Sequence, residues 1–207
     1  MPDSKPQALV AYGDMRSGNC WKMRWVLELT EQRYRWQETD ILAGASRRDA
    51  FLKLNPNGRV PLLQLPDGQC IAESNAIIHY LADGTKLLPA TRLARAQVLQ
   101  WQFFEQYSHE PNIAVARFIR QFTDWPQTRA NEYDSKRAPG LAALGIMEVH
   151  LADRAWFVGD ALTLADISLY AYTHVADEGG FDLAAFPALR GWLHRCAAQL
   201  PDIGIGR

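Results

Sequence analysis

The chain has 207 residues, with 22 lysines and arginines against 23 aspartates and glutamates, and a formal net charge of −1. This length allows one large domain or two small ones, and 48% hydrophobic with 22% charged residues excludes disordered and fibrous classes. A net charge near zero gives no electrostatic attraction to nucleic acid or to an anionic membrane, so neither is expected as a partner.

The N-terminal residues and the cysteines indicate a protein of the reducing cytoplasm. No long apolar run follows residues 1–7, as a secretory signal would require, and no stretch approaches the roughly 20 apolar residues that span a bilayer. Cys20, Cys70 and Cys196 are odd in number and far apart, so they cannot form a full disulfide framework. The five histidines have no paired metal-binding spacing, so no metal is expected.

The first eighty residues alternate between strand and helix patterns. Strands are predicted over 8–12, 34–38, 60–65 and 69–72, and helices over 20–30, 46–54 and 73–81. On the first helix Cys20, Met23 and Leu27 share an apolar face from which Lys22 is excluded. Ser74 is the predicted N-cap of the third helix, whose apolar face is predicted to contain Ile77, Tyr80 and Leu81. A turn at 66–68 joins the last two strands as an antiparallel hairpin, which predicts a small mixed sheet covered by helices.

Beyond a linker predicted at 83–91, only helical periods remain. A long helix from Arg92 pauses near Pro111 and resumes to Phe122, and another is predicted over 141–155. One stripe of the long helix consists of Leu93, Ala96, Gln100, Phe103 and Tyr107. Two further helices have apolar faces that begin at Leu164 and Leu189, and Thr163 with Asp166 forms a structural capping-box pattern.

Four segments of the chain, in order, resemble the cytosolic glutathione S-transferases. They are residues 17–24 (SGNCWKMR), 54–63 (LNPNGRVPLL), 71–78 (IAESNAII) and 157–167 (FVGDALTLADI). The resemblance implies a thioredoxin-like α/β domain over 7–82 (βαβαββα) and an all-α helical bundle over 92–207. It also implies a cytoplasmic, homodimeric detoxification enzyme whose co-substrate is glutathione and whose second, small hydrophobic electrophilic substrate meets the helical domain.

The expected glutathione site lies around two short motifs. A helix N-terminus attracts a carboxylate, so Ser74 with Glu73 suits the carboxylate and ammonium of a γ-glutamyl group. The resemblance implies a cis Val60–Pro61 bond, with the backbone of Val60 pairing with the peptide as an added strand does. Arg59 is a candidate for the glycyl carboxylate, with a solvated surface arginine as the alternative.

Ser17 is the candidate catalytic residue because serine-type relatives place a hydroxyl at the start of this helix. Its hydroxyl would stabilise the glutathione thiolate, with helix capping as the alternative role and Asn19 as a rival donor. Cys20, the third possibility, lies on the apolar face of the helix and is interpreted as a buried structural thiol.

Candidates for the second substrate are Arg16, Tyr107, Arg117 and Phe118, with core packing or solvation as alternatives. Residues 69–78, Trp101 and Phe104 are candidates for the dimer contact. Two other functions stay open: a noncatalytic binding or assembly protein of the same fold, and a Cys20-dependent glutathione disulfide reductase or lyase. The sequence does not identify the electrophile.

Overall fold

The computed structural model describes residues 8–205, which divide into two compact units. The first unit extends to Thr85 and includes the C-terminal residues from Pro201, and the second spans Lys86–Leu200. The indole Nε1 of Trp25 donates to the carbonyl of Pro201 at 3.2 Å, which attaches the C-terminal segment to the first unit. The sequence had assigned this segment to the helical domain.

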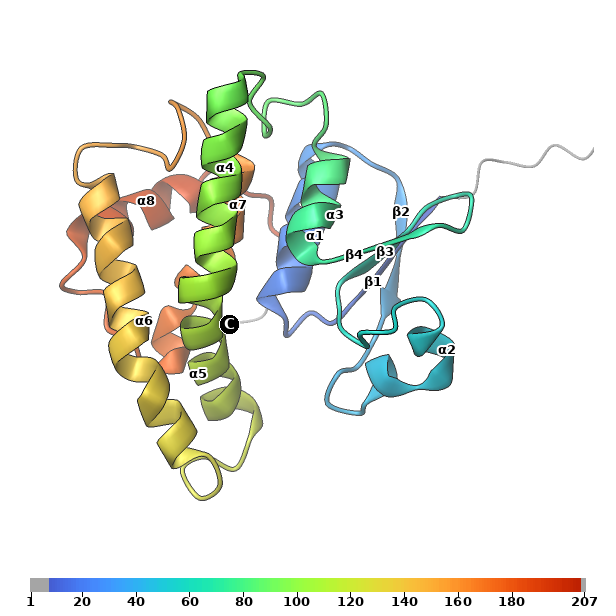
Figure 1. Ribbon diagram of the computed structural model, residues 1–207, viewed down its shortest axis with the longest axis horizontal. Helices are drawn as coiled ribbons and strands as arrows, with labels where there is room; N and C mark the ends of the chain where they lie inside the picture. The colour runs from blue at the N-terminus through green and yellow to red at the C-terminus, as the bar shows by residue number, and fades with distance from the viewer. Residues whose placement is uncertain (1–7, 206–207) are drawn as a thin grey trace, which may run out of the picture. The chain divides into compact units, whose positions relative to one another are not determined.

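The first unit contains a four-stranded mixed sheet (Figure 1). Its strands are β1 (Leu9–Gly13), β2 (Tyr34–Glu38), β3 (Leu62–Gln64) and β4 (Cys70–Ala72), in the order β2-β1-β3-β4. β1 pairs with β2 in parallel and with β3 antiparallel, and β3 pairs with β4 antiparallel. The predicted mixed sheet and its terminal hairpin are therefore confirmed.

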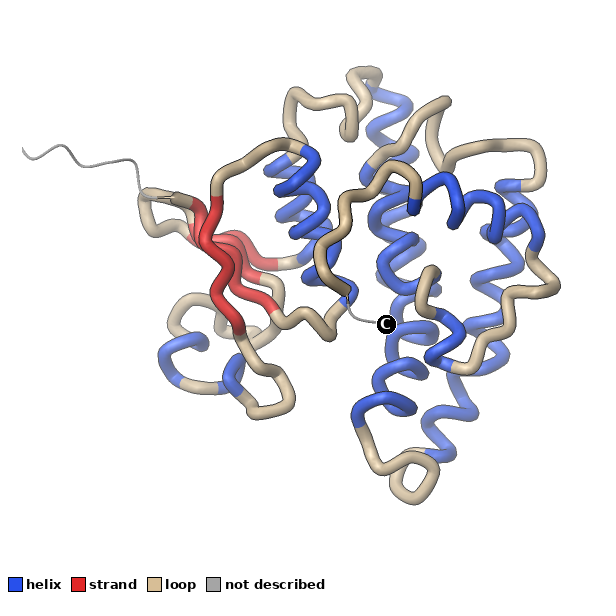
Figure 2. The backbone as a smooth tube through the Cα atoms, turned by 180° about the vertical axis from the view of Figure 1, so that it is seen from behind, coloured by secondary structure: helices blue, strands red, loops and turns tan. Residues whose placement is uncertain are grey.

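Two helices of the first unit, α1 (Gly18–Leu29) and α3 (Ser74–Leu81), lie side by side on one face of the sheet (Figures 1 and 2). The helix predicted over 46–54 is instead a 3₁₀ turn, Ala45–Arg47, followed by the single-turn α2 (Asp49–Leu52). The two pieces are separate because the backbone of Arg48 between them is extended, with φ −77° and ψ 148°.

In these helices one charged side chain off the apolar face is nevertheless buried, and one side-chain prediction is wrong. Lys22 is 0% exposed, because its ammonium group turns inward and donates to the Ser74 hydroxyl at 3.5 Å. Tyr80, which the pattern placed on the apolar face of α3, is 51% exposed, whereas Ile77, Ile78 and Leu81 fill the core. Periodicity assigned both faces correctly in outline but could not detect a charged group with a buried partner.

The second unit is helical throughout its regular elements. Its elements are α4 (Arg92–Phe104), a π-helical segment (Glu105–His109), α5 (Glu110–Phe122), α6 (Ala130–Leu151), α7 (Leu164–Thr173), a 3₁₀ turn (Ala176–Gly179) and α8 (Pro187–Ala197). The pause predicted near Pro111 is the π-helical segment. α6 begins eleven residues before its predicted start and continues through Pro139, because Tyr133 and Gly140 are packed into the core.

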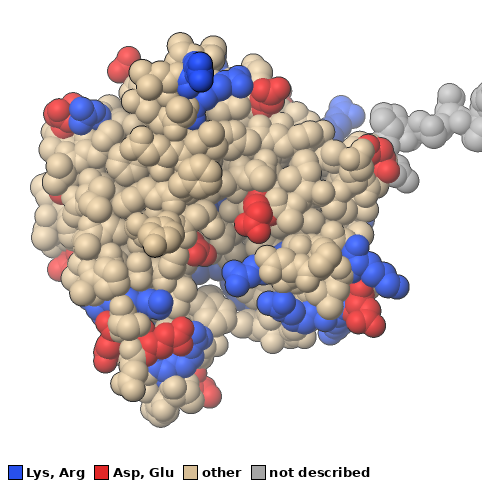
Figure 3. Space-filling view, viewed as in Figure 1, with Lys and Arg blue, Asp and Glu red and all other residues tan. Residues whose placement is uncertain are grey.

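The predicted stripe of α4 lies on the solvent side of the helix. Leu93 and Phe103 are each 70% exposed and Tyr107 is 88% exposed, while Val98 and Trp101 on the opposite side are buried. Figure 3 shows few charged side chains over the length of α4. Trp101 is enclosed by the rings of Phe104, His150 and Phe157, at centroid distances of 5.3, 4.7 and 4.6 Å. Trp101 is therefore a core residue, and the apolar face that α4 exposes is formed by its neighbours.

The predicted capping box at the start of α7 is confirmed, and its carboxylate is fully buried. Asp166 Oδ2 accepts from the backbone N–H and the hydroxyl of Thr163, both at 2.9 Å. Asp166 Oδ1 accepts from the backbone of Phe157 at 3.1 Å and from the indole of Trp192 at 3.0 Å. One side chain therefore connects α7 to the preceding loop and to α8.

Within residues 8–205, no helix is both long enough and apolar enough to cross a lipid bilayer. The three cysteines are free: Cys20 and Cys196 are buried and Cys70 is partly exposed.

Candidate functional site

The loop between β1 and α1 is organised by a buried aspartate. Asp14 is 1% exposed, its carbonyl accepts from the backbone N–H of Ser17 at 3.0 Å, and its own N–H donates to Cys20 Sγ at 3.4 Å. Only glycine fits at the preceding position, because a Cβ on Gly13 would collide with the ring of Trp36. The first residues of α1 are therefore held by the backbone of the loop.

Ser17 occupies the N-cap position of α1, but its hydroxyl does not cap the helix. The Ser17 side chain is instead one of the two hydrogen-bonding groups that lower the pKa of the neighbouring Cys20 thiol, against the larger effect of burial. The structure thus disfavours the capping role that was the alternative for this residue.

Cys20 is a buried thiol, as predicted from its place on the apolar face. It is 0% exposed, and this burial raises the pKa of its thiol to about 12, against the opposing effect of its hydrogen bonds from Asp14 and Ser17. A thiol with this pKa stays protonated at neutral pH and is a poor nucleophile.

Asn19 and Ser74 meet although they are 55 residues apart. The Ser74 hydroxyl donates to Asn19 Oδ1 at 3.2 Å and accepts from Lys22 Nζ at 3.5 Å. This chain joins the start of α1 to the start of α3, so a rival thiolate donor and the predicted γ-glutamyl site lie in one cluster. Lys22 was missed at the sequence level, where the only signal was a charged residue between two apolar ones, Trp21 and Met23.

Glu73, rather than Ser74, is the N-cap of α3, and Ser74 is the first helical residue. The shift arises because Glu73 has a positive φ of 69°, which lies outside the helical region. Glu73 is exposed and Ser74 is buried. The carboxylate is therefore at the surface beside the helix N-terminus, and the hydroxyl lies beneath it.

The Val60–Pro61 peptide bond is cis, as the resemblance implied, and Leu62 is the first residue of β3. Val60 thus lies just outside the strand. The preceding carbonyl, of Arg59, accepts from the side-chain amide of Asn55 at 2.8 Å, which fixes the approach to Val60. The Arg59 side chain is exposed, in agreement with either of its two predicted roles.

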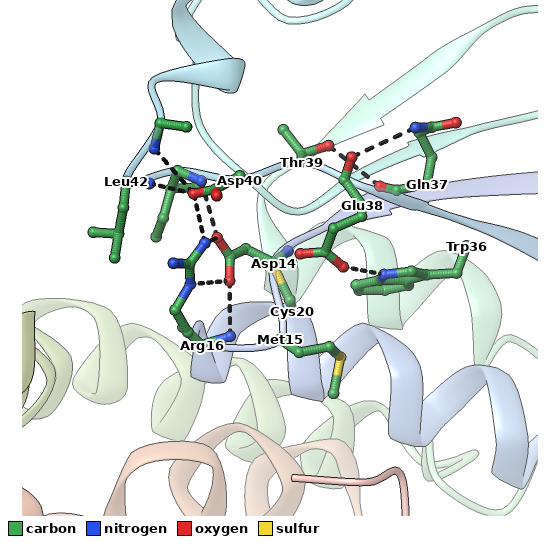
Figure 4. A network of polar contacts seen from close by, with 12 residues as sticks. Asp14, Met15, Arg16, Cys20, Trp36, Gln37, Glu38, Thr39, Asp40 and Leu42 are labelled. Atoms are coloured by element: carbon green, nitrogen blue, oxygen red, sulfur yellow. Dashed lines mark hydrogen bonds and ion pairs between the residues drawn. The ribbon is translucent and has the colours of Figure 1, made fainter. Parts of the chain in front are cut away.

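Arg16 is engaged in a polar network within the first unit, which argues against its predicted contact with the second substrate (Figure 4). Its Nε and Nη2 donate to the two carboxylate oxygens of Asp14 at 2.8 and 2.6 Å, and Nη2 also donates to Asp40 at 2.6 Å. Asp40 accepts in addition from the backbone of Leu42 and Ala43. The network joins the β1–α1 loop to the segment after β2.

Burial opposes ionisation of Asp14, but donation from Arg16 and from the backbone of Ile41 outweighs it and holds the pKa of the carboxyl below its ordinary value. The partnership with Asp14 and Asp40 raises the pKa of Arg16 in turn. Both groups are charged at neutral pH, and Asp14 is a functional candidate that sequence reasoning missed.

The other three second-substrate candidates belong to the second unit. Tyr107 lies on the π-helical segment and projects into solvent. Arg117 is buried, and its Nε donates to Glu178 at 2.5 Å, so its charge is matched within this unit. Phe118 packs against Phe122 at 5.7 Å and lies under the guanidinium of Arg129. Of these three side chains, Tyr107 has the most solvent-accessible surface.

Comparison with known proteins supports the same family on both units. Residues 16–83 match the family described as "Glutathione S-transferase, N-terminal domain", and residues 106–199 match "Glutathione S-transferase, C-terminal domain". The chain is 36% identical over 194 residues to maleylacetoacetate isomerase of Rhizobium meliloti (strain 1021), covering 91% of each chain. It is also 38% identical over 147 residues to elongation factor 1-gamma of Artemia salina. That match covers 67% of this chain but only 33% of the length of that protein.

Solved structures agree with these sequence matches. A glutathione S-transferase from Pseudomonas fluorescens [Pf-5] superposes with a TM-score of 0.93 at 49% identity, over 97% of this chain and 100% of that one. Ure2p in complex with glutathione superposes with a TM-score of 0.85 at 26% identity, over 95% and 97% of the two chains. The expected fold, a thioredoxin-like domain followed by a helical domain, is therefore confirmed.

Proposed function

Because this chain belongs to the glutathione S-transferase family, we propose that it is a transferase that activates the thiolate of glutathione for attack on a small hydrophobic electrophile. The observation that carries this proposal is the cluster of Ser17, Asn19 and Ser74 at the beginning of α1 and α3. In it, Asn19, one of the two predicted thiolate donors, is joined to the predicted γ-glutamyl site by the 3.2 Å hydrogen bond from Ser74, and Ser17 lies two residues earlier at the N-cap of α1.

Each residue of the cluster has a distinct role in this proposal. Glu73 binds the ammonium of the γ-glutamyl group and Ser74, with the α3 N-terminus, binds its carboxylate, because unpaired helix N–H groups favour an anion. The backbone of Val60, preceding Pro61, pairs with the peptide of glutathione, and Arg59 meets the glycyl carboxylate. The Ser17 hydroxyl donates to the sulfur and favours its ionised form.

The test is a pH titration of thiolate absorbance in the binary complex with glutathione. The free thiol has a pKa of about 8.5, and binding should lower it. Ser17→Ala should raise the bound pKa by about one unit and reduce turnover at neutral pH, while glutathione affinity stays within a few fold. If Asn19→Ala shifts the titration and Ser17→Ala does not, the role belongs to Asn19.

A second candidate reaction is glutathione-dependent isomerisation of a double bond. It is favoured by 36% identity to a maleylacetoacetate isomerase over 91% of both chains. The same activated thiolate would add to the conjugated double bond, permit rotation and leave again, so no net consumption of glutathione occurs. Assays that follow loss of free glutathione and isomerisation of a cis-enone diacid separate the two reactions.

The structure disfavours the Cys20-dependent alternative, because the Cys20 thiol is buried and stays protonated at neutral pH. Mass spectrometry after exposure to oxidised glutathione should show no adduct at Cys20. The similarity to elongation factor 1-gamma and Ure2p leaves open the alternative that the chain is a noncatalytic binding or assembly protein. A chain that binds glutathione without lowering the thiol pKa, and that transforms no electrophile or enone in a broad panel, would belong to that class.

We further propose that the protein is a cytoplasmic homodimer that acts in detoxification. Support for the dimer comes from the apolar face that α4 and the π-helical segment expose, formed by Leu93, Leu99 and Phe103 of α4 and Tyr107 of the π-helical segment, because such a surface on a monomer is costly to hydrate. This face replaces Trp101 and Phe104 as the candidate contact. Sedimentation should give a dimer mass for the parent and a monomer mass for Phe103→Glu, whereas a monomeric parent at all concentrations would contradict the proposal.

A further inference from the structure

We propose that Arg16 is a positioning residue of the transferase site, which holds the Ser17 loop in place and neutralises the two carboxylates that lie beside it. The inference rests on the proposed function, because it assigns to Arg16 an effect on the glutathione thiolate that Ser17 is proposed to stabilise. Arg16 itself acts through Asp14 and Asp40 and needs no contact with either substrate.

The first part of the argument is geometric. The guanidinium of Arg16 donates two hydrogen bonds to the Asp14 carboxylate, and the backbone N–H of Arg16 donates a third, to Asp14 Oδ1 at 2.9 Å. The backbone of Asp14 in turn contacts the start of α1: its carbonyl accepts from the N–H of Ser17, and its N–H donates to the sulfur of Cys20. Ser17 also acts on that sulfur, because its side chain lowers the pKa of the Cys20 thiol. Any displacement of Asp14 would therefore move both atoms that fix the orientation of Ser17.

The network is also anchored outside the loop. Asp14 Oδ2 accepts from the backbone N–H of Ile41 at 2.9 Å, and Asp40 accepts from Nη2 of Arg16 at 2.6 Å (Figure 4). The chain that follows β2 thus forms a fixed support for the loop. A bidentate guanidinium contact defines distance and direction together, which an ammonium group does not do.

The second part of the argument is electrostatic. The carboxylate of Asp14 is three residues from Ser17 and is buried, where charges interact more strongly than in water. The sulfur of Cys20, in the first turn of α1, shows the effect of this charge: burial is the main cause of the raised pKa of Cys20, and the negative charges of Asp14 and Glu38 raise it further. The same charge would oppose ionisation of a glutathione thiol bound at Ser17, and the guanidinium of Arg16 offsets it.

Other charged groups face this region from neighbouring elements. Lys22 on α1 contacts Ser74, Arg24 on α1 contacts Met15, and Glu38 at the end of β2 accepts from the indole of Trp36. Arg16 is not a partner in any of these three contacts. Arg16→Met therefore removes one positive charge from the region and takes this partner away from the carboxylates of Asp14 and Asp40.

The experiment measures the apparent pKa of glutathione bound to the full chain, by thiolate absorbance, together with the dissociation constant from calorimetry. The variants are Arg16→Met, Arg16→Lys and the double variant Asp14→Asn/Arg16→Met. Arg129→Met is the matched control, because Arg129 also forms a bidentate pair, with Glu132 at 2.8 and 2.7 Å, but in the other unit. Circular dichroism confirms that each variant is folded.

Arg16→Met should raise the bound thiol pKa by about one unit, which lowers the thiolate fraction at neutral pH by up to about tenfold, and Arg16→Lys should raise it by less. The double variant also removes the Asp14 charge, so the electrostatic part of the shift should disappear and the bound pKa should return part of the way to the parent value, while the part caused by lost positioning of Ser17 remains. Arg129→Met should titrate as the parent does.

The inference is wrong if Arg16→Met titrates like the parent, or if the double variant is no closer to the parent than Arg16→Met. Arg16→Lys keeps the positive charge but loses the bidentate contact with Asp14. Should Arg16→Met fail to fold, a parent-like titration of Arg16→Lys would therefore overturn the positioning role. A parent protein that leaves the glutathione pKa at its free value would instead refute the proposed function, and this inference with it.

Discussion

Removal of the Asp166 carboxylate should be among the most destabilising single changes in the chain. In Asp166→Ala the donors of Phe157, Thr163 and Trp192 lose an acceptor that is 0% exposed. A buried donor left without a partner costs about 1–3 kcal/mol, and loss of a helix N-cap costs about 1 kcal/mol. Because the buried charge is itself unfavourable and water can replace some partners, we expect a net loss of about 4 kcal/mol.

Chemical denaturation followed by circular dichroism and by tryptophan fluorescence measures this loss. For a protein of this length, about 4 kcal/mol corresponds to a fall in Tm of roughly 8–16 °C. Asp153→Ala is the matched control, because Asp153 is 72% exposed and its ion pair is with the exposed neighbour Arg154, so its loss should cost less than about 1 kcal/mol. An Asp166→Ala protein within about 1 kcal/mol of the parent would refute the proposed role of the buried carboxylate.

The same carboxyl predicts the direction of a pH effect. Burial raises the pKa of Asp166 above its ordinary value of 3.8, so near that pH the folded state binds more protons at this site than the unfolded state. Its contribution to the free energy of unfolding is therefore fully present below 3.8 and falls as the pH rises through the folded-state pKa. Asp166→Asn should remove this part of the pH dependence in denaturation curves.

Three other outcomes are expected. Glu73→Ala and Ser74→Ala should each weaken glutathione binding about tenfold or more in calorimetry, with little change in unfolding, since one charge-assisted hydrogen bond contributes about 1.5–3 kcal/mol; parent-like affinity in both would place the site elsewhere. Burial lowers the pKa of His150 below 6.5. The stability that its neutral form provides should therefore be lost as the pH falls from 6.5 through the folded-state pKa. His150→Gln should reduce this acid sensitivity, measured as the midpoint of urea denaturation. A thiol reagent should label only Cys70 in the native protein; rapid native labelling of Cys20 would contradict its burial.

Local patterns predicted the fold well where a residue's neighbours in sequence determine its environment. Strand alternation, the 66–68 turn and the Thr163–Asp166 capping box all depend on short-range chemistry, and each is present in the structure. The start of α6 was missed because Pro139 and Gly140 interrupt the helical pattern. Packing of Gly140 against Phe181, which is distant in sequence, overrides that local signal.

The candidate site was predictable as a set of motifs but not as a network. Nothing in the sequence indicates that Arg16 turns to Asp40 instead of toward a substrate, because that contact depends on the position of the chain after β2. The burial of Lys22 depends in the same way on the approach of Ser74 from α3. For α4, periodicity identified an apolar stripe correctly, but a second stripe on the opposite side, with Val98 and Trp101, enters the core.

The π-helical segment Glu105–His109 sets the rotational phase between α4 and α5. A π turn accommodates more residues than an α turn, so it behaves as an insertion that was absorbed without breaking the helix. Deleting one residue from it would favour a continuous α-helix and rotate every later side chain of α5 by about 100° relative to α4. Arg117 would then turn away from Glu178, so length changes in this segment should be far less tolerated than substitutions on its exposed side, such as at Tyr107.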